Sequence, residues 1–373
     1  MKIFFVIMEM LYQNLAHFTH GMSLMFFVML TIDTYRVRDK SRLLLFTFLL
    51  MLFWTLLLLK DLGFLLEGVW ENPYLSSINL SIDLWGIPAV SLFLFELLSP
   101  GWVTKSRALL IFLPFLLLTF LFAFTGAHFI FTFSLWFAHL VALCLVIFSI
   151  LVIERYNRFI HANYSQIENR TVKWLRTFVL LLYICFVTWS LANNHTSWLG
   201  DSIYYLVLIV ICYFLYRNAK KQIVNKVPGL FDLFSEEKQA KPQNECPGDT
   251  HYKSEFSSLL QKIMKEEKLY LHPALSLNEL ATAVGTNRTY LSDYLNHTLN
   301  ITFYDYVNSY RVAESCLQLS LEDPMSLEEI AEACGFNSLS TFRRSFYKEK
   351  QMTPFQYKKK IQFNSKMETH QEP

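Results

Sequence analysis

The sequence predicts an all-α protein in which a seven-helix transmembrane bundle is followed by a soluble domain with two helix-turn-helix units joined by a long helix. Three observations predict this fold class. Hydrophobic residues make up 53% of the 373 residues, and the excess over an ordinary soluble sequence lies almost wholly before Arg217. Lysine and arginine gather in alternate loops of this apolar half. The more polar remainder contains the stretch Ser276–Gly285 and a second copy of it, Ser326–Gly335.

Seven stretches of the apolar half approach the roughly 20 mostly apolar residues that a transmembrane helix needs. They are Gln13–Asp33, Leu43–Leu59, Ile78–Leu98, Ala108–Thr125, Ile130–Ile153, Thr177–Ala192 and Ser202–Tyr216. His17 and His20 interrupt the first stretch, which is therefore the weakest of the set. Together the stretches predict a multi-pass membrane domain over residues 1–217 that contacts the lipid bilayer.

The orientation of these spans follows from the loop charges, because cytoplasmic loops are enriched in lysine and arginine. One set of alternate loops is basic, whereas the other set holds only Lys60 beside acidic residues. The basic residues are Arg36, Arg38, Lys40, Arg42, Lys105, Arg107, Arg155, Arg158, Arg170, Lys173, Arg176, Arg217, Lys220, Lys221 and Lys226. We therefore expect a membrane protein with its N-terminus outside and its C-terminal half in the cytoplasm.

Ionisable residues within a span are candidates for function. Those near or within the spans are His17, His20, Asp83, Glu96 and His139. We take His139 and Glu96 as candidate signal-sensing residues; the alternatives are that His139 is a hydrogen-bonded packing residue and that Glu96 reaches the membrane interface.

The sequence does not indicate an enzyme, because it contains no HExxH or GxSxG motif. The six cysteines show neither a CxxC pair nor a histidine at metal spacing, so no metal and no cofactor is expected.

Residues 218–253 are predicted to be a flexible cytoplasmic linker, because "SEEKQAKPQNECPGDT" is polar and contains two prolines and a glycine. A second folded domain is expected over residues 254–361, and residues 362–373 are expected to form a disordered tail.

The internal repeat has the features of two helix-turn-helix units. Each copy opens with a Ser-x-x-Glu capping box, in which the serine and glutamate satisfy free N–H groups at a helix start. Each copy ends at a glycine, Gly285 or Gly335, which adopts a left-handed turn at low cost. A second helix follows with apolar seam residues, which are Leu291 and Leu295 in the first copy and Phe342 and Phe346 in the second. The second helix of such a unit enters the DNA major groove.

The side chains between the seam residues should face outward. In the second copy they include Arg343 and Arg344, which can bind guanine or phosphate. The domain is not basic overall, but its charge is segregated. Acidic Glu328, Glu329 and Glu332 lie on the first helix, whereas the lysines and arginines lie on and after the second. The alternative interpretation is a plain helical domain that does not bind DNA, in which the two arginines simply lie on a solvated face.

The stretch "IAEACGFNSLSTFRRSFYKEKQMTPFQYK" resembles the C-terminal signature of AraC/XylS-type transcription regulators, and "TNRTYLSDYLN" resembles that family's other helix-turn-helix. The resemblance covers Leu269–Lys360 and implies binding to specific double-stranded DNA. Two positions depart from the family pattern: Gln351 stands where glycine is frequent, and Asp293 stands where a basic residue is frequent. The membrane half is similar to that of AraC-type regulators of the Bacteroidetes type, in its layout and in the loop "YSQIENRTVKWLR".

These observations predict a membrane-anchored one-component transcription regulator that senses an unknown signal ligand and acts as a homodimer. The alternatives are a passive membrane anchor, a transporter or channel fused to a DNA-binding domain, and an intramembrane enzyme. The candidate DNA-binding residues are Asn287, Arg288, Thr289, Ser292, Asp293, Ser338, Leu339, Ser340, Thr341, Arg343, Arg344 and Lys348.

Overall fold

The structure, a computed structural model, describes residues 2–65, 72–168, 170–192, 198–221, 250–321 and 325–369. Within these ranges the regular elements are helices. The chain divides into two compact units. The bundle unit comprises residues 1–156 and 172–237, and the C-terminal unit comprises residues 157–171 and 238–373. The all-α class and the seven long apolar helices are confirmed.

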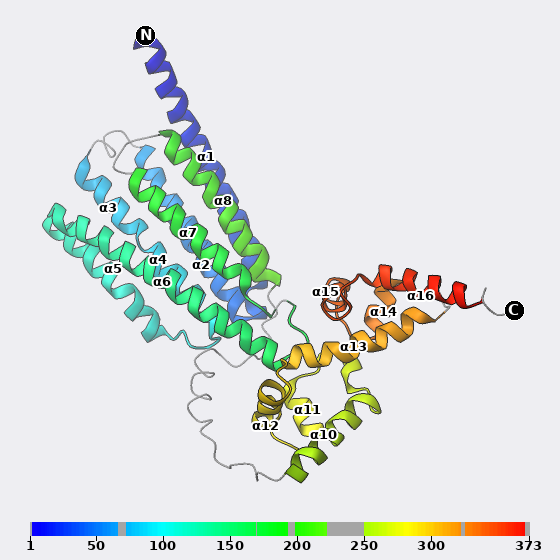
Figure 1. The fold of residues 1–373 in the computed structure, drawn as a ribbon. Coiled ribbons are helices and arrows are strands. Elements are labelled where there is room, and N and C mark those ends of the chain that lie inside the picture. Colours follow the sequence, from blue (N-terminus) through cyan, green and yellow to red (C-terminus); the bar gives the residue numbers. More distant parts are fainter. Residues whose placement is uncertain are drawn as a thin grey trace. The chain divides into compact units, whose positions relative to one another are not determined.

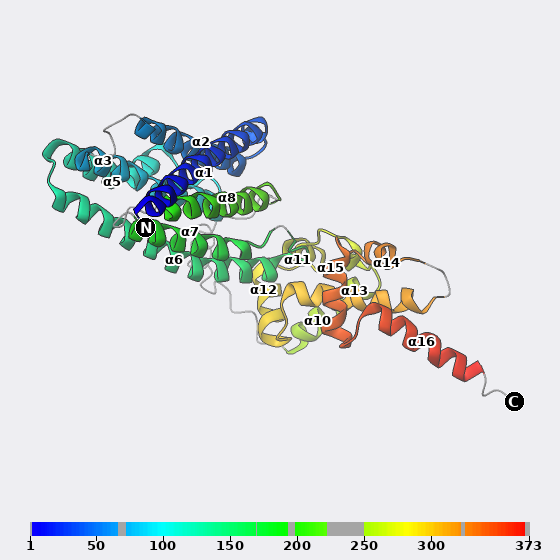
Figure 2. The same cartoon turned by 90° about the horizontal axis from the view of Figure 1, so that it is seen from above.

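The bundle unit is built from long apolar helices, which are labelled in Figure 1. They are α1 (Lys2–Val37), α2 (Arg42–Asp61), α3 (Pro73–Asp83), α4 (Gly86–Leu98), α5 (Lys105–Thr125), α6 (His128–Asn163), α7 (Lys173–Ala192) and α8 (Trp198–Lys221). By length and composition, seven segments could cross a membrane, with α3 and α4 together counted as one. Helix α1 packs against both α2 and α8, as Figure 2 shows from above.

The third apolar stretch, predicted as one span, is broken between α3 and α4. Leu84 and Trp85 form a turn between the two helices. Pro88 lies in the first turn of α4, where it provides no N–H and its ring would clash with the Leu84 carbonyl of a continuous helix. The proline therefore explains why the helix stops and restarts.

Glu96 lies near the end of α4 and is held by contacts within the bundle unit. It is 1% exposed, and its carboxylate is paired with Arg42, whose Nε lies 2.8 Å from Oε1. The Gly101 amide donates to the same carboxylate at 2.9 Å. These contacts fix the loop after α4 to the start of α2, so the residue has a structural role here.

The C-terminal unit contains the helices of both predicted repeats. They are α10 (Thr250–Lys265), α11 (Leu277–Ala283), α12 (Arg288–Asp293), α13 (Phe303–Ser320), α14 (Leu327–Ala333), α15 (Leu339–Lys350) and α16 (Pro354–Thr369). In Figure 1, helix α13 joins the group formed by α10, α11 and α12 to the group formed by α14, α15 and α16. The long connecting helix is therefore confirmed.

The predicted domain boundaries differ from the structure in three places. Residues 222–249 of the predicted linker lie outside the described residues, but its ends are helical, since α8 continues to Lys221 and α10 starts at Thr250. The predicted disordered tail is helical as far as Thr369, because no glycine or proline interrupts the residues after Pro354. Residues 157–171, expected in the membrane domain, group with the C-terminal unit.

Both helix-turn-helix repeats have the predicted local structure. Ser276 with Glu279, and Ser326 with Glu329, form complete capping boxes at the starts of α11 and α14. After these helices the chain turns at Gly285, with φ of 70°, and at Gly335, with φ of 82°. The sequence pattern thus specified both helix starts and both turns.

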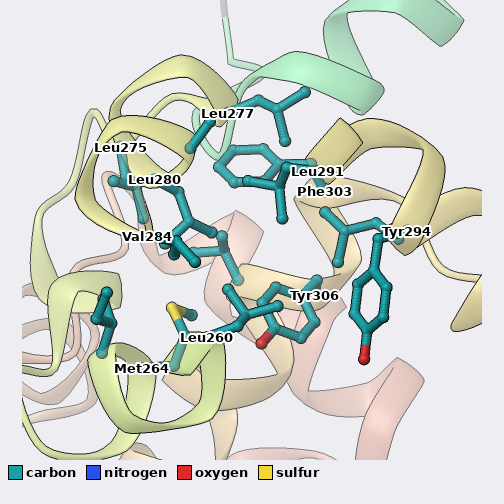
Figure 3. Close-up of a cluster of buried hydrophobic side chains, with 14 of the residues drawn as sticks. Leu260, Met264, Leu275, Leu277, Leu280, Val284, Leu291, Tyr294, Phe303 and Tyr306 are labelled. Carbon is teal, nitrogen blue, oxygen red and sulfur yellow. The ribbon is translucent and has the colours of Figure 1, made fainter. Parts of the chain in front are cut away.

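Two hydrophobic cores lie at the two ends of α13. The first core is formed by α10, α11, α12 and the start of α13, and Leu280, Leu291 and Val307 are completely buried in it (Figure 3). The second core is formed by the end of α13 with α14 and α15, and it contains the seam residues Phe342 and Phe346. Helix α13 therefore contributes to both cores and links them.

The two turn glycines differ in their surroundings. A Cβ atom at Gly335 would lie 2.6 Å from the backbone oxygen of Leu271, whereas nothing lies within 4 Å of a Cβ at Gly285. Gly335 is therefore required both for its backbone conformation and for a close backbone contact.

We predict that Gly335→Ala destabilises the C-terminal unit more than Gly285→Ala. Each alanine must adopt a left-handed conformation, at a cost of about 1–2 kcal/mol. Displacing the Leu271 backbone should add about 1–3 kcal/mol for Gly335→Ala alone. Urea-dependent hydrogen exchange of α14 and α15 in the full-length protein would measure the free energy of unfolding of each variant. Equal destabilisation would contradict the close contact.

Candidate nucleic-acid interface

Helices α12 and α15 are the second helices of the two repeats, and each is capped by a candidate DNA-binding residue. The Asn287 side chain accepts a hydrogen bond from the Tyr290 amide at 2.8 Å. The Ser338 hydroxyl accepts one from the Thr341 amide at 3.2 Å. These two side chains therefore stabilise the helix starts. Only their remaining hydrogen-bonding groups are available to DNA.

Helix α15 has one buried and one exposed face. Phe342 and Phe346 are completely buried, whereas Arg343, Arg344 and Lys348 are exposed. Tyr347, which lies one turn after Arg343, is 54% exposed and was not predicted as a contact. The exposed face thus combines cationic side chains with an aromatic ring, which suits phosphate and base contacts.

Two of these cations are oriented by contacts to α13. Arg344 Nη2 donates to the Tyr304 hydroxyl at 3.2 Å. Lys348 Nζ lies 2.7 Å from the Asp305 carboxylate. Both partners come from the first turn of α13, which also packs in the first core. The exposed face of α15 is therefore held in a defined orientation relative to the first repeat.

Helix α12 presents a less basic surface than α15. Thr289 and Asp293 are exposed, and Ser292 is half-buried. Asn296 Nδ2 donates to the Ser292 hydroxyl at 3.2 Å, and the Asp293 carboxylate lies 3.5 Å from His297 Nε2. A carboxylate can accept from cytosine N4 but repels phosphate, so this helix is suited to base contacts more than to backbone contacts.

Segment 157–171 contacts candidate DNA-binding residues of both repeats. Arg288 Nε donates to the Asn163 side chain at 2.8 Å. The Glu168 carboxylate accepts hydrogen bonds from the hydroxyls of Ser338 and Thr341 at the start of α15. Thr341 is 7% exposed in this arrangement. No sequence pattern predicts these contacts, although Glu168 lies in the loop "YSQIENRTVKWLR" that carries part of the resemblance.

Segment 157–171 engages part of the candidate DNA-binding set. Arg343, Arg344 and Lys348 lie on the exposed face of α15, which Leu339 borders as a half-buried residue. The candidates that donate hydrogen bonds to segment 157–171 are Arg288, Ser338, Ser340 and Thr341. Among the residues that the structure describes, no group of three or more His, Cys, Asp or Glu side chains could hold a metal ion.

The candidate sensing residues lie in the bundle unit. His139 Nε2 is 3.0 Å from the Ser190 hydroxyl, and its ring centroid is 4.5 Å from that of Phe186. This is the packing arrangement that was considered as the alternative for His139. Glu96 forms the ion pair with Arg42 described above.

Comparison with known proteins identifies part of this unit. A family model described as a helix-turn-helix domain matches residues 280–360. Residues 280–360 form an AraC-type helix-turn-helix domain. This supports the C-terminal part of the resemblance, whereas the membrane part has no such support.

The relatives of this domain are named as regulators. An uncharacterized HTH-type transcriptional regulator of Staphylococcus aureus (strain COL) is 30% identical over 117 residues, which are 29% of this chain and 16% of that protein. The uncharacterized HTH-type transcriptional regulator YtdP of Bacillus subtilis (strain 168) is 32% identical over 112 residues, which are 30% of this chain and 14% of that protein. The match therefore spans only a small part of these relatives.

A solved structure is also similar to this chain. The C-terminal domain of the two-component response regulator yesN from Fusobacterium nucleatum is 31% identical. The match covers 27% of this chain and 96% of that domain, with a TM-score of 0.25.

We predict that Arg344→Ala removes sequence-specific DNA binding. Loss of one bidentate arginine contact to guanine costs about 1–3 kcal/mol, which is roughly 5- to 150-fold in affinity. DNA fragments selected by the full-length protein would be titrated with each variant. Lys265→Ala, an exposed residue of α10, is the matched control and should bind as the unaltered protein does. An unchanged footprint for Arg344→Ala would place the interface elsewhere.

We also predict that Glu168→Ala increases the DNA affinity of the full-length protein by several-fold. The change removes a carboxylate that occupies the hydroxyls of Ser338 and Thr341, so these groups become available to DNA. The matched control is Glu266→Ala, an exposed carboxylate at the end of α10. Reduced affinity of Glu168→Ala would instead indicate that the segment supports the DNA-binding conformation.

Proposed function

We propose that this protein is a membrane-anchored one-component transcription regulator and not an enzyme. Its apolar helices cross the bacterial inner membrane, its C-terminal unit binds specific DNA in the cytoplasm, and a signal received by the bundle alters DNA binding. The observation that carries the proposal is the presence, on one chain, of seven helices suited to a membrane and an AraC-type helix-turn-helix domain.

The topology is supported by the distribution of charge. The basic loop residues, such as Arg36, Arg107 and Arg176, lie in alternate loops together with the residues after α8. Since lysine and arginine mark cytoplasmic loops, an odd number of crossings places the N-terminus outside and the C-terminal unit inside. The charge argument is independent of the helix-turn-helix motif and leads to the compartment that contains DNA.

DNA binding is supported by the exposed face of α15 and by the regulator names of the relatives. Helix α12 is less basic than α15, so one C-terminal unit alone should bind DNA weakly. A homodimer would offset this, because binding of one unit raises the effective concentration of the other at the adjacent half-site. The linker and segment 157–171 are the routes by which a change in the bundle would reach these units.

A passive anchor and a transporter or channel fused to a DNA-binding domain remain the alternatives. A cavity in the bundle unit, described below, favours a ligand-responsive bundle over a passive anchor.

The proposal is tested with a fluorescent protein fused after Pro373 and a reporter gene under a promoter that the protein binds. For the full-length chain we expect fluorescence at the membrane, because the fused protein folds in the cytoplasm, and reporter output that depends on growth conditions. Deletion of Met1–Lys221 should disperse the fluorescence and remove that dependence.

Two results would contradict parts of the proposal. A full-length fusion whose C-terminus is accessible from outside the cell would overturn the topology. Unchanged, condition-dependent reporter output after the deletion would make the bundle a passive anchor.

A further inference from the structure

The bundle unit contains a cavity of about 360 Å³, which lies within the size range of small-molecule sites. Its wall is formed by residues of α1, α2, α3, α4, α6, α7 and α8. Neither His139 nor Glu96 lines this cavity. The cavity is therefore a separate feature from the candidate sensing residues that the sequence suggested.

One end of the cavity is acidic. Asp61, Asp83 and Asp201 are wall residues, and they come from the end of α2, the end of α3 and the start of α8. Lys60 pairs with two of them, at 2.7 Å from Asp61 Oδ1 and 2.8 Å from Asp83 Oδ1, but is not among the wall residues described. The titratable wall residues other than tyrosine and cysteine are therefore these carboxylates and two histidines, His17 and His20.

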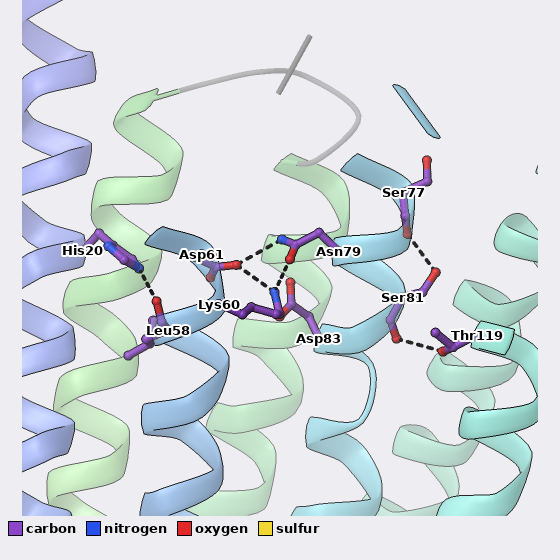
Figure 4. A network of polar contacts seen from close by, with 9 residues as sticks. All are labelled: His20, Leu58, Lys60, Asp61, Ser77, Asn79, Ser81, Asp83 and Thr119. Carbon is purple, nitrogen blue, oxygen red and sulfur yellow. Dashed lines mark hydrogen bonds and ion pairs between the residues drawn. The ribbon is translucent and has the colours of Figure 1, made fainter. Parts of the chain in front are cut away.

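The single ammonium near this cluster is already saturated (Figure 4). Lys60 Nζ contacts Asp61, Asp83 and the Asn79 side-chain oxygen, the last at 2.7 Å. An ammonium group has three N–H donors, so these three acceptors use all of them. Lys60 is thus unavailable to an anionic ligand, and its positive charge is shared by Asp61 and Asp83.

Asp201 differs from the other two carboxylates. Within the described part of the chain, its side chain makes no hydrogen bond or ion pair, although it is only partly exposed. A partly buried carboxylate without a partner is costly, and a cationic ligand would provide that partner.

Aromatic rings also form part of the wall. Trp54, Trp189, Trp198, Tyr204 and Tyr205 line the cavity. The faces of such rings attract organic cations and exclude water. Deeper in the bundle, the wall becomes apolar, with Leu94, Val146 and Leu208.

We propose that this cavity binds an organic ammonium ion that carries a hydrophobic group. The ammonium lies against Asp201 between the aromatic rings, and the hydrophobic group extends toward the leucine-lined end. His20, another wall residue, is held in place, because its Nε2 donates to the Leu58 carbonyl at 3.1 Å and its ring lies against that of Tyr205. The role of the ligand as the signal rests on the proposed function, whereas its binding does not.

The test uses the full-length protein in nanodiscs of zwitterionic lipid, without DNA. Three probes with the same chain length are titrated and followed by calorimetry and tryptophan fluorescence: octylamine, 1-octanol and octanoate. Empty nanodiscs correct for partition into lipid. We expect saturable binding of octylamine, binding of 1-octanol at least tenfold weaker, and no saturable binding of octanoate.

Variants locate the site. Asp201→Asn should weaken octylamine binding at least tenfold and leave 1-octanol binding unchanged. The change removes the charge, and within the described part of the chain it breaks no hydrogen bond or ion pair. Asp201→Glu, which keeps the charge, should retain octylamine binding. The matched control is Glu154→Gln, a carboxylate of α6 that is 62% exposed, is paired with Arg176 and is not a wall residue. Circular dichroism confirms that each variant is folded.

Each contrary outcome has a defined meaning. Equal affinity for octylamine and 1-octanol, preference for octanoate, or unchanged octylamine binding by folded Asp201→Asn would overturn the proposed site. In a separate titration of the same nanodiscs with DNA that the protein selects, octylamine binding without any change in DNA occupancy would refute its role as the signal and leave the site intact. Failure of the full-length protein to bind DNA both with and without octylamine would instead contradict the regulator function.

Discussion

The arrangement of the C-terminal unit depends on one buried arginine. Arg311 of α13 is 1% exposed, and its guanidinium donates to the backbone carbonyls of Tyr270 at 2.7 Å and His272 at 2.8 Å. Burial lowers the pKa of Arg311 to about 10, so the group stays charged at neutral pH. Its hydrogen bonds hold the segment before α11 against α13, and this segment contacts Gly335 of the second repeat. The buried charge thus ties the two repeats together.

Much of the fold could be predicted because its signals are local. Capping boxes, turn glycines and seam residues lie within a few positions of each other, and the periodicity of Phe342 and Phe346 specifies which face of α15 is buried. The sequence shows two prolines within apolar stretches, but it does not distinguish Pro88, where the helix breaks, from Pro114, which lies inside the continuous helix α5. The residues after Lys360 lack an apolar pattern, and for this reason the sequence predicts a disordered tail where α16 continues to Thr369.

The candidate interface was predictable only in part, because its contacts join residues far apart in the sequence. Which residues face outward on α15 follows from periodicity, but the contacts of Arg344 with Tyr304 and of Arg288 with Asn163 require the tertiary structure. The same is true of the cavity. His17, His20 and Asp83 are ionisable residues that the sequence places in apolar helices, whereas the pairing of Asp83 with Lys60 arises only when α2 and α3 meet.

The ion pair between Lys348 and Asp305 affects how the protein would respond to ionic strength. The affinity of a protein for DNA falls with added salt because phosphate contacts displace condensed counterions from the double helix. A lysine that is already neutralised within the chain displaces fewer of them, since it must first leave its own carboxylate. The exposed face of α15 would therefore lose affinity less steeply at high ionic strength than its number of cations suggests, and recognition would depend more on the bases than on the backbone.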